Sequence, residues 1–147
     1  MRLYLETTVP NFLFAEDAPD KRRATELFFD WLRVSSDELF ASKLVEEEIA
    51  ACPEPKRSQM VNVLRGLPLR VLPVAVECSA LADEYVRAGI IPGRFKNDAL
   101  HVAVAVWHKL EVVVSWNMAH LVNMRKVERI NAVSAALRTY FAVLQRA

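Results

Sequence analysis

The chain has 147 residues, of which 53% are hydrophobic and 25% are charged, and its formal net charge at pH 7 is +1. This size and composition predict a single folded domain over residues 1–147 and argue against a disordered protein. No apolar run reaches the roughly 18 residues of a membrane-spanning helix, and the opening MRLYLETTVP lacks the form of a signal peptide. We therefore expect a cytoplasmic protein with no membrane partner, in which any nucleic-acid binding depends on local basic patches.

The cysteines and histidines form no zinc motif in the sequence. Cys52 and Cys78 lack the spacing of metal ligands, and we expect both to be buried thiols. His101, His108 and His120 do not form an HExxH pattern, and the three glycines do not build a phosphate-binding loop. These features disfavour a zinc enzyme and a nucleotide-binding fold of the P-loop or dinucleotide type.

In the first half of the chain, short apolar segments alternate with amphipathic helical ones. We expect a strand at Arg2–Leu5, followed by a short helical segment from about Val9. Apolar residues at helical spacing predict a helix over Asp20–Val34. A candidate strand at Glu38–Ala41 precedes a helix over Lys43–Cys52, which a proline ends.

The second half continues the alternation. We expect helices at Pro55–Leu67, Ala75–Arg87 and Asp98–Lys109. The strands between and after them are expected at Leu69–Leu72 and Glu111–Trp116. Helix Ala75–Arg87 should be closed by the glycine that follows it.

This alternation predicts an α/β protein with a mostly parallel sheet of four to five strands, covered by helices on both faces. The run Val112–Val114 is apolar throughout, as expected of a central strand buried on both sides, and we expect it beside Arg2–Leu5. The tail from Val127 should begin as a helix, and Tyr140–Leu144 is a candidate last strand. Ligands of such sheets bind beyond the carboxyl ends of the strands.

Two polar residues directly follow predicted strands. Glu6 follows the first strand, and Asn117 follows the strand ending at Trp116, so we expect the two side by side at one edge of the sheet. Each also has a structural interpretation. Glu6 could be a solvated carboxylate at a strand end, and Asn117 could cap the short helix that follows.

The helix Lys43–Cys52 contains three successive acids, Glu46, Glu47 and Glu48. At about 100° per residue, Glu48 lies within the apolar arc of the helix, whereas Glu46 and Glu47 point away from it. A carboxylate turned toward the core needs a partner, because an unpaired buried charge is costly. That partner is either a core-facing arginine or a metal ion.

Asp98 begins a helix that is apolar on nearly every side and should be deeply buried. A buried helix would hold this carboxylate rigidly, as a metal ligand requires, although Asp98 could also serve as a helix cap. His101, one turn later, is expected to be a hydrogen-bonded structural group, with a direct catalytic role as the alternative. Three carboxylates and one amide, on separate elements, suit Mg²⁺ or Mn²⁺ better than zinc.

Four segments resemble, in order, the motifs of the PIN-domain family. The opening YLETT is similar to the family's first strand, which ends in Asp-Thr-Ser. The segment SKLVEEEI resembles its Ser-to-Glu motif and assigns the acid to Glu48. The segments NDALHVAVA and VVVSWNMAHL resemble the third and fourth motifs and assign their positions to Asp98 and Asn117. The likeness runs from Leu3 to about Asn123 and is greatest to VapC-like toxins of bacterial type II toxin–antitoxin pairs.

The resemblance implies a PIN-like three-layer α/β/α domain and a metal-dependent ribonuclease that hydrolyses RNA. Its catalytic residues would be Glu6, Glu48, Asp98 and Asn117, with Mg²⁺ or Mn²⁺ held by the three carboxylates. It also implies a cognate antitoxin and a homodimer. Two positions depart from the family, because Glu6 and Asn117 each stand where aspartate is usual. The longer side chain and the lost charge imply a variant site with weaker metal affinity.

Five cations near the motif segments are candidates for phosphate contacts. They are Lys43, Arg94, Lys96, Arg125 and Lys126. The alternative for each of them is a solvated surface cation.

Two other functions remain open at this stage. One is a catalytically weak or inactive PIN domain that binds RNA or protein, which Asn117 favours. The other is an unrelated flavodoxin-like or receiver-type domain, for which the sequence lacks the phosphate loop or the acidic pair with its lysine. The final segment, Ser134–Ala147, lacks the C-terminal segment that the resemblance to the PIN-domain family leads us to expect.

Overall fold

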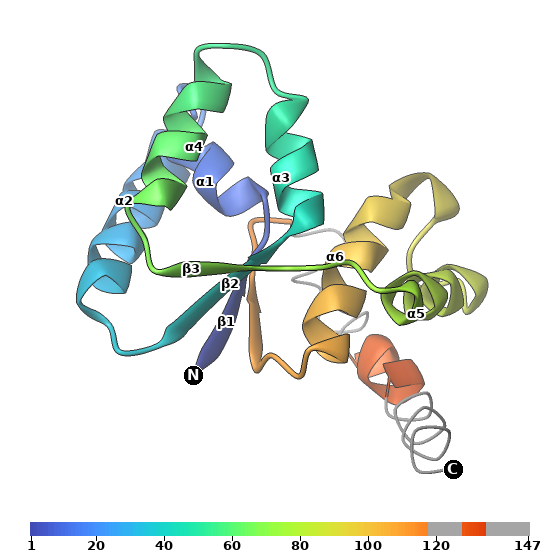
Figure 1. Ribbon diagram of the computed structural model, residues 1–147. Helices are drawn as coiled ribbons and strands as arrows, with labels where there is room; N and C mark the ends of the chain where they lie inside the picture. The colour runs from blue at the N-terminus through green and yellow to red at the C-terminus, as the bar shows by residue number, and fades with distance from the viewer. Residues whose placement is uncertain (118–127, 135–147) are drawn as a thin grey trace. The chain divides into compact units, whose positions relative to one another are not determined.

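A computed structural model describes residues 1–117 and 128–134 of the chain (Figure 1). The chain forms two compact units. The first consists of Met1–Pro73 together with Glu111–Trp116, and the second begins with Val74–Leu110 and continues from Asn117.

The first unit contains a parallel four-stranded sheet. Its strands are β1 (Arg2–Leu5), β2 (Glu38–Ser42), β3 (Leu69–Leu72) and β4 (Val112–Val114), in the order β3-β2-β1-β4. All three strand pairs are parallel. The predicted parallel sheet is therefore confirmed, and so is the pairing of β1 with β4. The candidate strand Tyr140–Leu144 lies outside the described residues.

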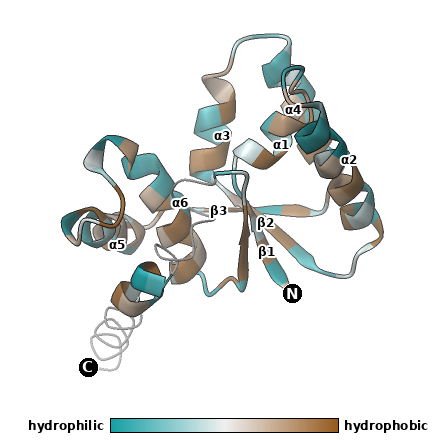
Figure 2. Cartoon of the chain, turned by 180° about the vertical axis from the view of Figure 1, so that it is seen from behind, coloured by the Kyte–Doolittle hydropathy of each residue, from teal (hydrophilic) through white to brown (hydrophobic). Residues whose placement is uncertain are grey.

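The predicted burial of β4 on both faces is wrong. The strand is uniformly hydrophobic (Figure 2), yet all three of its valines are only partly buried. Within the described sheet, β4 has a neighbouring strand on one side only, namely β1. A run of apolar residues shows that a strand is hydrophobic, but the burial of the strand also depends on its position in the sheet.

Four helices of the first unit lie on one side of the sheet (Figure 1). They are α1 (Thr8–Phe12), α2 (Pro19–Val34), α3 (Lys43–Ala50) and α4 (Lys56–Arg65). The long helix α2 begins with a proline at its first position, where a backbone N–H would have no hydrogen-bond acceptor within the helix. The predicted helices at these places are confirmed, with boundaries shifted by a few residues.

The core of the first unit forms between these helices and one face of the sheet. Alternate residues of β1, Leu3 and Leu5, pack with Phe29 and Leu32 of α2 in one buried cluster. Between them, Tyr4 of β1 is also fully buried, on the opposite face of the strand. Successive buried positions are expected of a parallel strand covered on both faces.

A buried hydroxyl pair links β1 to the start of α3. The hydroxyl oxygens of Tyr4 and Ser42 lie 2.8 Å apart, and Ser42 Oγ also accepts a hydrogen bond from the Val45 N–H at 3.4 Å as the N-cap of α3. We expect Ser42→Ala to lower the free energy of unfolding by about 1–3 kcal/mol, because it removes both interactions. Urea denaturation measures this loss. As a control, the exposed Ser58→Ala in α4 should cost less than about 0.5 kcal/mol, and equal losses would contradict the prediction.

The second unit is helical in its described residues. It contains α5 (Val76–Arg87), the 3₁₀ turn η1 (Gly93–Phe95) and α6 (Lys96–Trp107), and residues 128–134 are also helical. Helix α5 is followed by Gly89 with a φ of +72°, which confirms the predicted closing glycine. Helix α6 begins two residues before the predicted start, where the 3₁₀ turn leads directly into it.

Helices α5 and α6 pack against each other. The buried positions of α6 are Ala99, His101, Val102, Ala103, Val104 and Ala105, which confirms its predicted deep burial. In α5, Cys78 is a buried thiol as predicted, but Cys52 of the first unit is only half-buried. No helix within residues 1–117 and 128–134 is both long enough and apolar enough to cross a membrane.

Candidate functional site

The carboxylate of Glu6 is held at the carboxyl end of β1. Only 3% of this residue is exposed, and its backbone N–H donates to the Val114 carbonyl at 3.1 Å, which continues the pairing of β1 with β4. Its Oε2 accepts hydrogen bonds from the Thr8 N–H at 3.1 Å and from the Thr8 hydroxyl at 2.5 Å. Ser115 Oγ donates to the same oxygen at 2.8 Å. The solvated strand-end carboxylate considered as an alternative is therefore wrong.

Thr8 connects the end of β1 to the end of β4. Besides donating to Glu6, its hydroxyl oxygen accepts a hydrogen bond from the Trp116 N–H at 2.9 Å. Sequence reasoning did not single out Thr8 or Ser115 as site residues. The available signal was weak: Ser115 lies near the end of the predicted strand Glu111–Trp116, and Thr8 is three residues beyond the end of its predicted neighbour Arg2–Leu5.

Glu48 points inward from α3, as the helical periodicity predicts. Glu46 and Glu47 are exposed, whereas Glu48 is half-buried. Its Oε1 accepts a hydrogen bond from the Thr7 hydroxyl at 2.6 Å. A carboxylate oxygen of Glu48 lies within 4.8 Å of one of Glu6, so the structure brings these two predicted site residues together.

This carboxylate pair is chemically suited to a divalent cation. It offers hard oxygen donors at short separation, and Mg²⁺ and Mn²⁺ prefer such donors in proteins. Three neutral hydroxyl groups, those of Thr7, Thr8 and Ser115, donate to the pair and orient it. Two like charges this close repel each other, and a cation between them would offset that repulsion.

The other two predicted site residues belong to the second unit. Asp98 is half-buried in the first turn of α6, where the helix dipole favours a negative charge. Asn117 is half-buried and follows Trp116. The register of β1 and β4 aligns Leu5 with Val114. Ser115, two residues before Asn117, is a hydrogen-bonding neighbour of Glu6 at this edge.

The three candidate phosphate-binding cations that the structure describes are on the surface. Lys43 forms an ion pair with Glu46 at 3.4 Å, and Lys96 forms one with Asp83 at 2.7 Å. The Arg94 guanidinium lies 5.0 Å from the ring centroid of the adjacent phenylalanine. Exposed ion pairs of this kind are weak, so they do not prevent contact with a phosphate. The last two candidates, at positions 125 and 126, lie outside the described residues.

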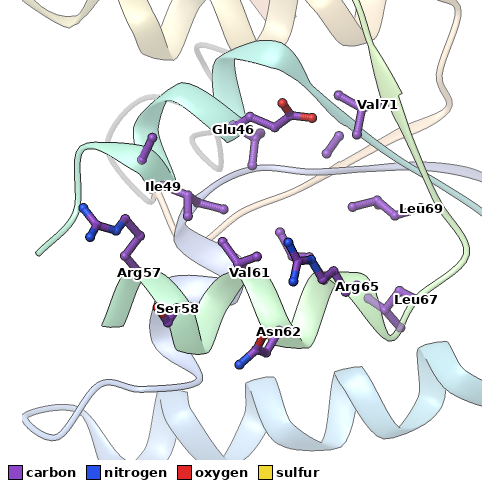
Figure 3. Close-up of a pocket in the computed structure, with 14 residues that line it drawn as sticks. Glu46, Ile49, Arg57, Ser58, Val61, Asn62, Arg65, Leu67, Leu69 and Val71 are labelled. Atoms are coloured by element: carbon purple, nitrogen blue, oxygen red, sulfur yellow. The ribbon is translucent and has the colours of Figure 1, made fainter. Parts of the chain in front are cut away.

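An apolar pocket of about 760 Å³ lies between α3, α4 and β3 (Figure 3). Ile49 of α3, Val61 of α4 and Leu69 of β3 line it, and Glu46 and Arg65 are among its polar lining residues. Neither carboxylate of the Glu6–Glu48 pair lines this pocket. It is therefore distinct from the candidate site.

Comparison with known proteins identifies a similar structure. No protein-family model matches the sequence, and no curated protein matches it. A solved structure does match, described as VapBC2 from Rickettsia felis bound to a DNA fragment from their promoter. The TM-score is 0.54 at 14% sequence identity, over 82% of this chain and 93% of that chain. The chain thus has the α/β fold expected of a PIN-type, VapC-like protein, with a parallel sheet flanked by helices, as its four sequence motifs predict.

Proposed function

We propose that the chain is a metal-dependent ribonuclease, the VapC-like toxin component of a toxin–antitoxin pair in the cytoplasm. The observation that carries this proposal is the Glu6–Glu48 pair, in which two oriented carboxylates lie within 4.8 Å of each other in the first unit. Glu6 lies at the carboxyl end of a parallel strand, where sheets of this class bind their ligands. The fold shared with VapBC2 supports the same function.

In this proposal, Glu6 and Glu48 bind Mg²⁺ or Mn²⁺ together with Asp98, which the third sequence motif assigns to the site. The cation would polarise a phosphoryl oxygen of RNA and lower the pKa of a bound water. Thr8 and Ser115 keep the Glu6 carboxylate in position by donating to its Oε2. The amide of Asn117 takes the fourth motif position and can orient a water without adding charge.

RNA and protein partners follow from the same proposal. Lys43, Arg94 and Lys96 are exposed and can contact phosphates of the substrate. The solved structure of similar fold is named as VapBC2. We accordingly propose a cognate antitoxin as the partner of this chain, and a homodimer as its assembly.

An RNA-cleavage assay tests the proposed activity. The wild-type protein should cut single-stranded RNA in Mn²⁺ or Mg²⁺ and should be inactive in EDTA, because no residue of the site supplies the Lewis acid itself. Asp98→Asn should remove the activity in either metal. Cleavage that persists in EDTA would contradict a metal-dependent mechanism.

A catalytically inactive domain that binds RNA or protein is the second candidate. The observation that favours it is Asn117, which gives the site one negative charge fewer than an aspartate would. Under this alternative, wild type does not cut RNA in any divalent metal. Asn117→Asp would then be the variant in which cleavage appears.

Replacing Thr8 by valine is expected to lower the metal-dependent cleavage rate about 10- to 100-fold, the usual effect of losing a group that orients a metal ligand. Valine has nearly the same shape but cannot donate to Glu6 or accept from the Trp116 N–H. Higher Mn²⁺ should restore part of the rate, because the variant loses metal affinity. The control is Ser35→Ala, which removes a hydroxyl that donates to Asp37. This variant should cleave RNA at the wild-type rate. A Thr8→Val rate equal to wild type at every Mn²⁺ concentration would show that Thr8 does not position Glu6.

A further inference from the structure

Trp116 directly follows the serine that contacts the Glu6 carboxylate, and its ring is held in a defined position. The indole Nε1–H donates to Thr25 Oγ1 at 2.9 Å. The ring also packs against Phe12, with 5.8 Å between the centroids. The ammonium of the exposed Lys21 lies 5.3 Å from the Phe12 centroid and 5.7 Å from the Trp116 centroid. An aromatic ring and a cation thus lie together at the end of β4.

A small pocket opens beside this ring. Its volume is about 230 Å³, below the roughly 300–1,000 Å³ of sites for drug-sized ligands. This size suits one planar ring system. The residues that line it are Val9, Ala24, Thr25, Phe28, Val114, Ser115 and Trp116. Two of them are aromatic, so the pocket offers flat surfaces to a flat ligand.

The pocket shares residues with the Glu6 site. Ser115 lines it and donates its hydroxyl to Glu6 Oε2 at 2.8 Å. Val9 also lines it, and the Val9 N–H donates to the Glu6 carbonyl at 3.0 Å. A ligand in the pocket therefore lies next to the carboxylate at which the proposed phosphodiester hydrolysis takes place.

We propose that this pocket binds one nucleobase of the RNA substrate, stacked on Trp116, with Lys21 at the adjacent phosphate. The inference rests on the proposed ribonuclease function and adds a base-binding subsite to it. Aromatic side chains beside a cation are the usual platform for a single-stranded base. An acidic pair alone repels RNA, and a stacked base would hold the backbone against that repulsion.

The pocket favours stacking over reading of the base edges. The Thr25 hydroxyl donates to the Lys21 carbonyl at 2.6 Å and accepts from Trp116. The Ser115 hydroxyl is engaged with Glu6. With both lining hydroxyl groups committed to the protein, binding should depend on the presence of a base more than on its identity.

Tryptophan fluorescence can test this subsite without catalysis. In a Trp31→Phe, Trp107→Phe background, Trp116 is the remaining tryptophan of the chain. Titration in EDTA would compare a short single-stranded RNA with an abasic oligoribonucleotide of the same length and phosphate charge. RNA should quench Trp116 and bind roughly 5- to 160-fold more tightly than the abasic chain, the range expected for one stacked base.

Two substitutions locate the effect. Trp116→Leu in the wild-type chain should bind both oligonucleotides equally, measured by anisotropy of labelled RNA. Ala24→Leu adds bulk at the exposed rim of the pocket and leaves the core unchanged, so it should also remove the preference for RNA with bases. The control is Ala80→Leu, which makes the same change at an exposed position of α5 and should keep the preference.

The outcomes separate this inference from the proposed function. If Ala24→Leu keeps the full preference for RNA over the abasic chain, or if the abasic chain quenches Trp116 equally, the base subsite is wrong. If wild type shows the preference but cuts no RNA in Mn²⁺, the ribonuclease proposal is wrong and the subsite stands. If both oligonucleotides bind equally to wild type while RNA is cut, the base subsite is wrong and the ribonuclease proposal stands. Loss of antitoxin binding by Ala24→Leu with RNA binding unchanged would assign the pocket to a protein partner and overturn the proposal.

Discussion

Glu48→Gln should reduce metal-dependent RNA cleavage by roughly 10²-fold or more, because a ligand to the catalytic cation contributes several kcal/mol to the transition state. The substitution keeps the shape of the side chain and its bond from the Thr7 hydroxyl, but removes the negative charge that faces Glu6. Cleavage rates at saturating RNA, measured over a series of Mn²⁺ concentrations, would give the size of the loss.

The same helix contains a matched control. Glu47→Gln makes the identical chemical change one residue earlier, at an exposed position, and should leave the rate within about twofold, as expected of a surface substitution that changes stability little. Equal losses in the two variants would mean that the charge of α3 matters rather than a ligand at Glu48. Full activity in Glu48→Gln would remove this residue from the proposed site.

Adding Mn²⁺ should raise the melting temperature of the wild-type protein by roughly 5–10 °C when the free metal is about 100 times its Kd, since binding to the folded state alone contributes about 2.7 kcal/mol. The cation would offset the repulsion between the Glu6 and Glu48 carboxylates, which lie within 4.8 Å of each other. EDTA should reverse the shift. The response should weaken at acidic pH, because protons compete with metal for the carboxylates.

Two substitutions at the motif positions should change this response in opposite directions. Asp98→Asn should abolish the Mn²⁺ shift while leaving the metal-free melting temperature equal or higher. Asn117→Asp should lower the metal-free melting temperature and enlarge the Mn²⁺ shift, because it adds a negative charge. Asp20→Asn, at an exposed position of α2, is the control and should keep the wild-type response. If Mn²⁺ shifts none of these proteins, the acidic residues do not form a working metal site, and the RNA- or protein-binding alternative gains support.

Several elements could be predicted from the sequence because their signals are local. Strands Arg2–Leu5 and Leu69–Leu72 have the predicted bounds, since each is a short, mainly apolar segment that ends before a charged residue or a proline. The inward direction of Glu48 follows from helical periodicity, which depends only on neighbouring residues. The four motifs, taken in order, predicted a fold that the likeness to VapBC2 supports.

The sequence by itself therefore determined the class of fold, the candidate acids and the orientation of α3, while tertiary structure decided what those acids contact. The register that aligns Leu5 with Val114 brings Ser115 to Glu6, and no local pattern reports a register between distant strands. The partial exposure of β4 likewise depends on strand order. Trp116 and Thr25, which line the pocket together, are 91 positions apart in sequence, and the hydrogen bond between them exists only after the chain has packed.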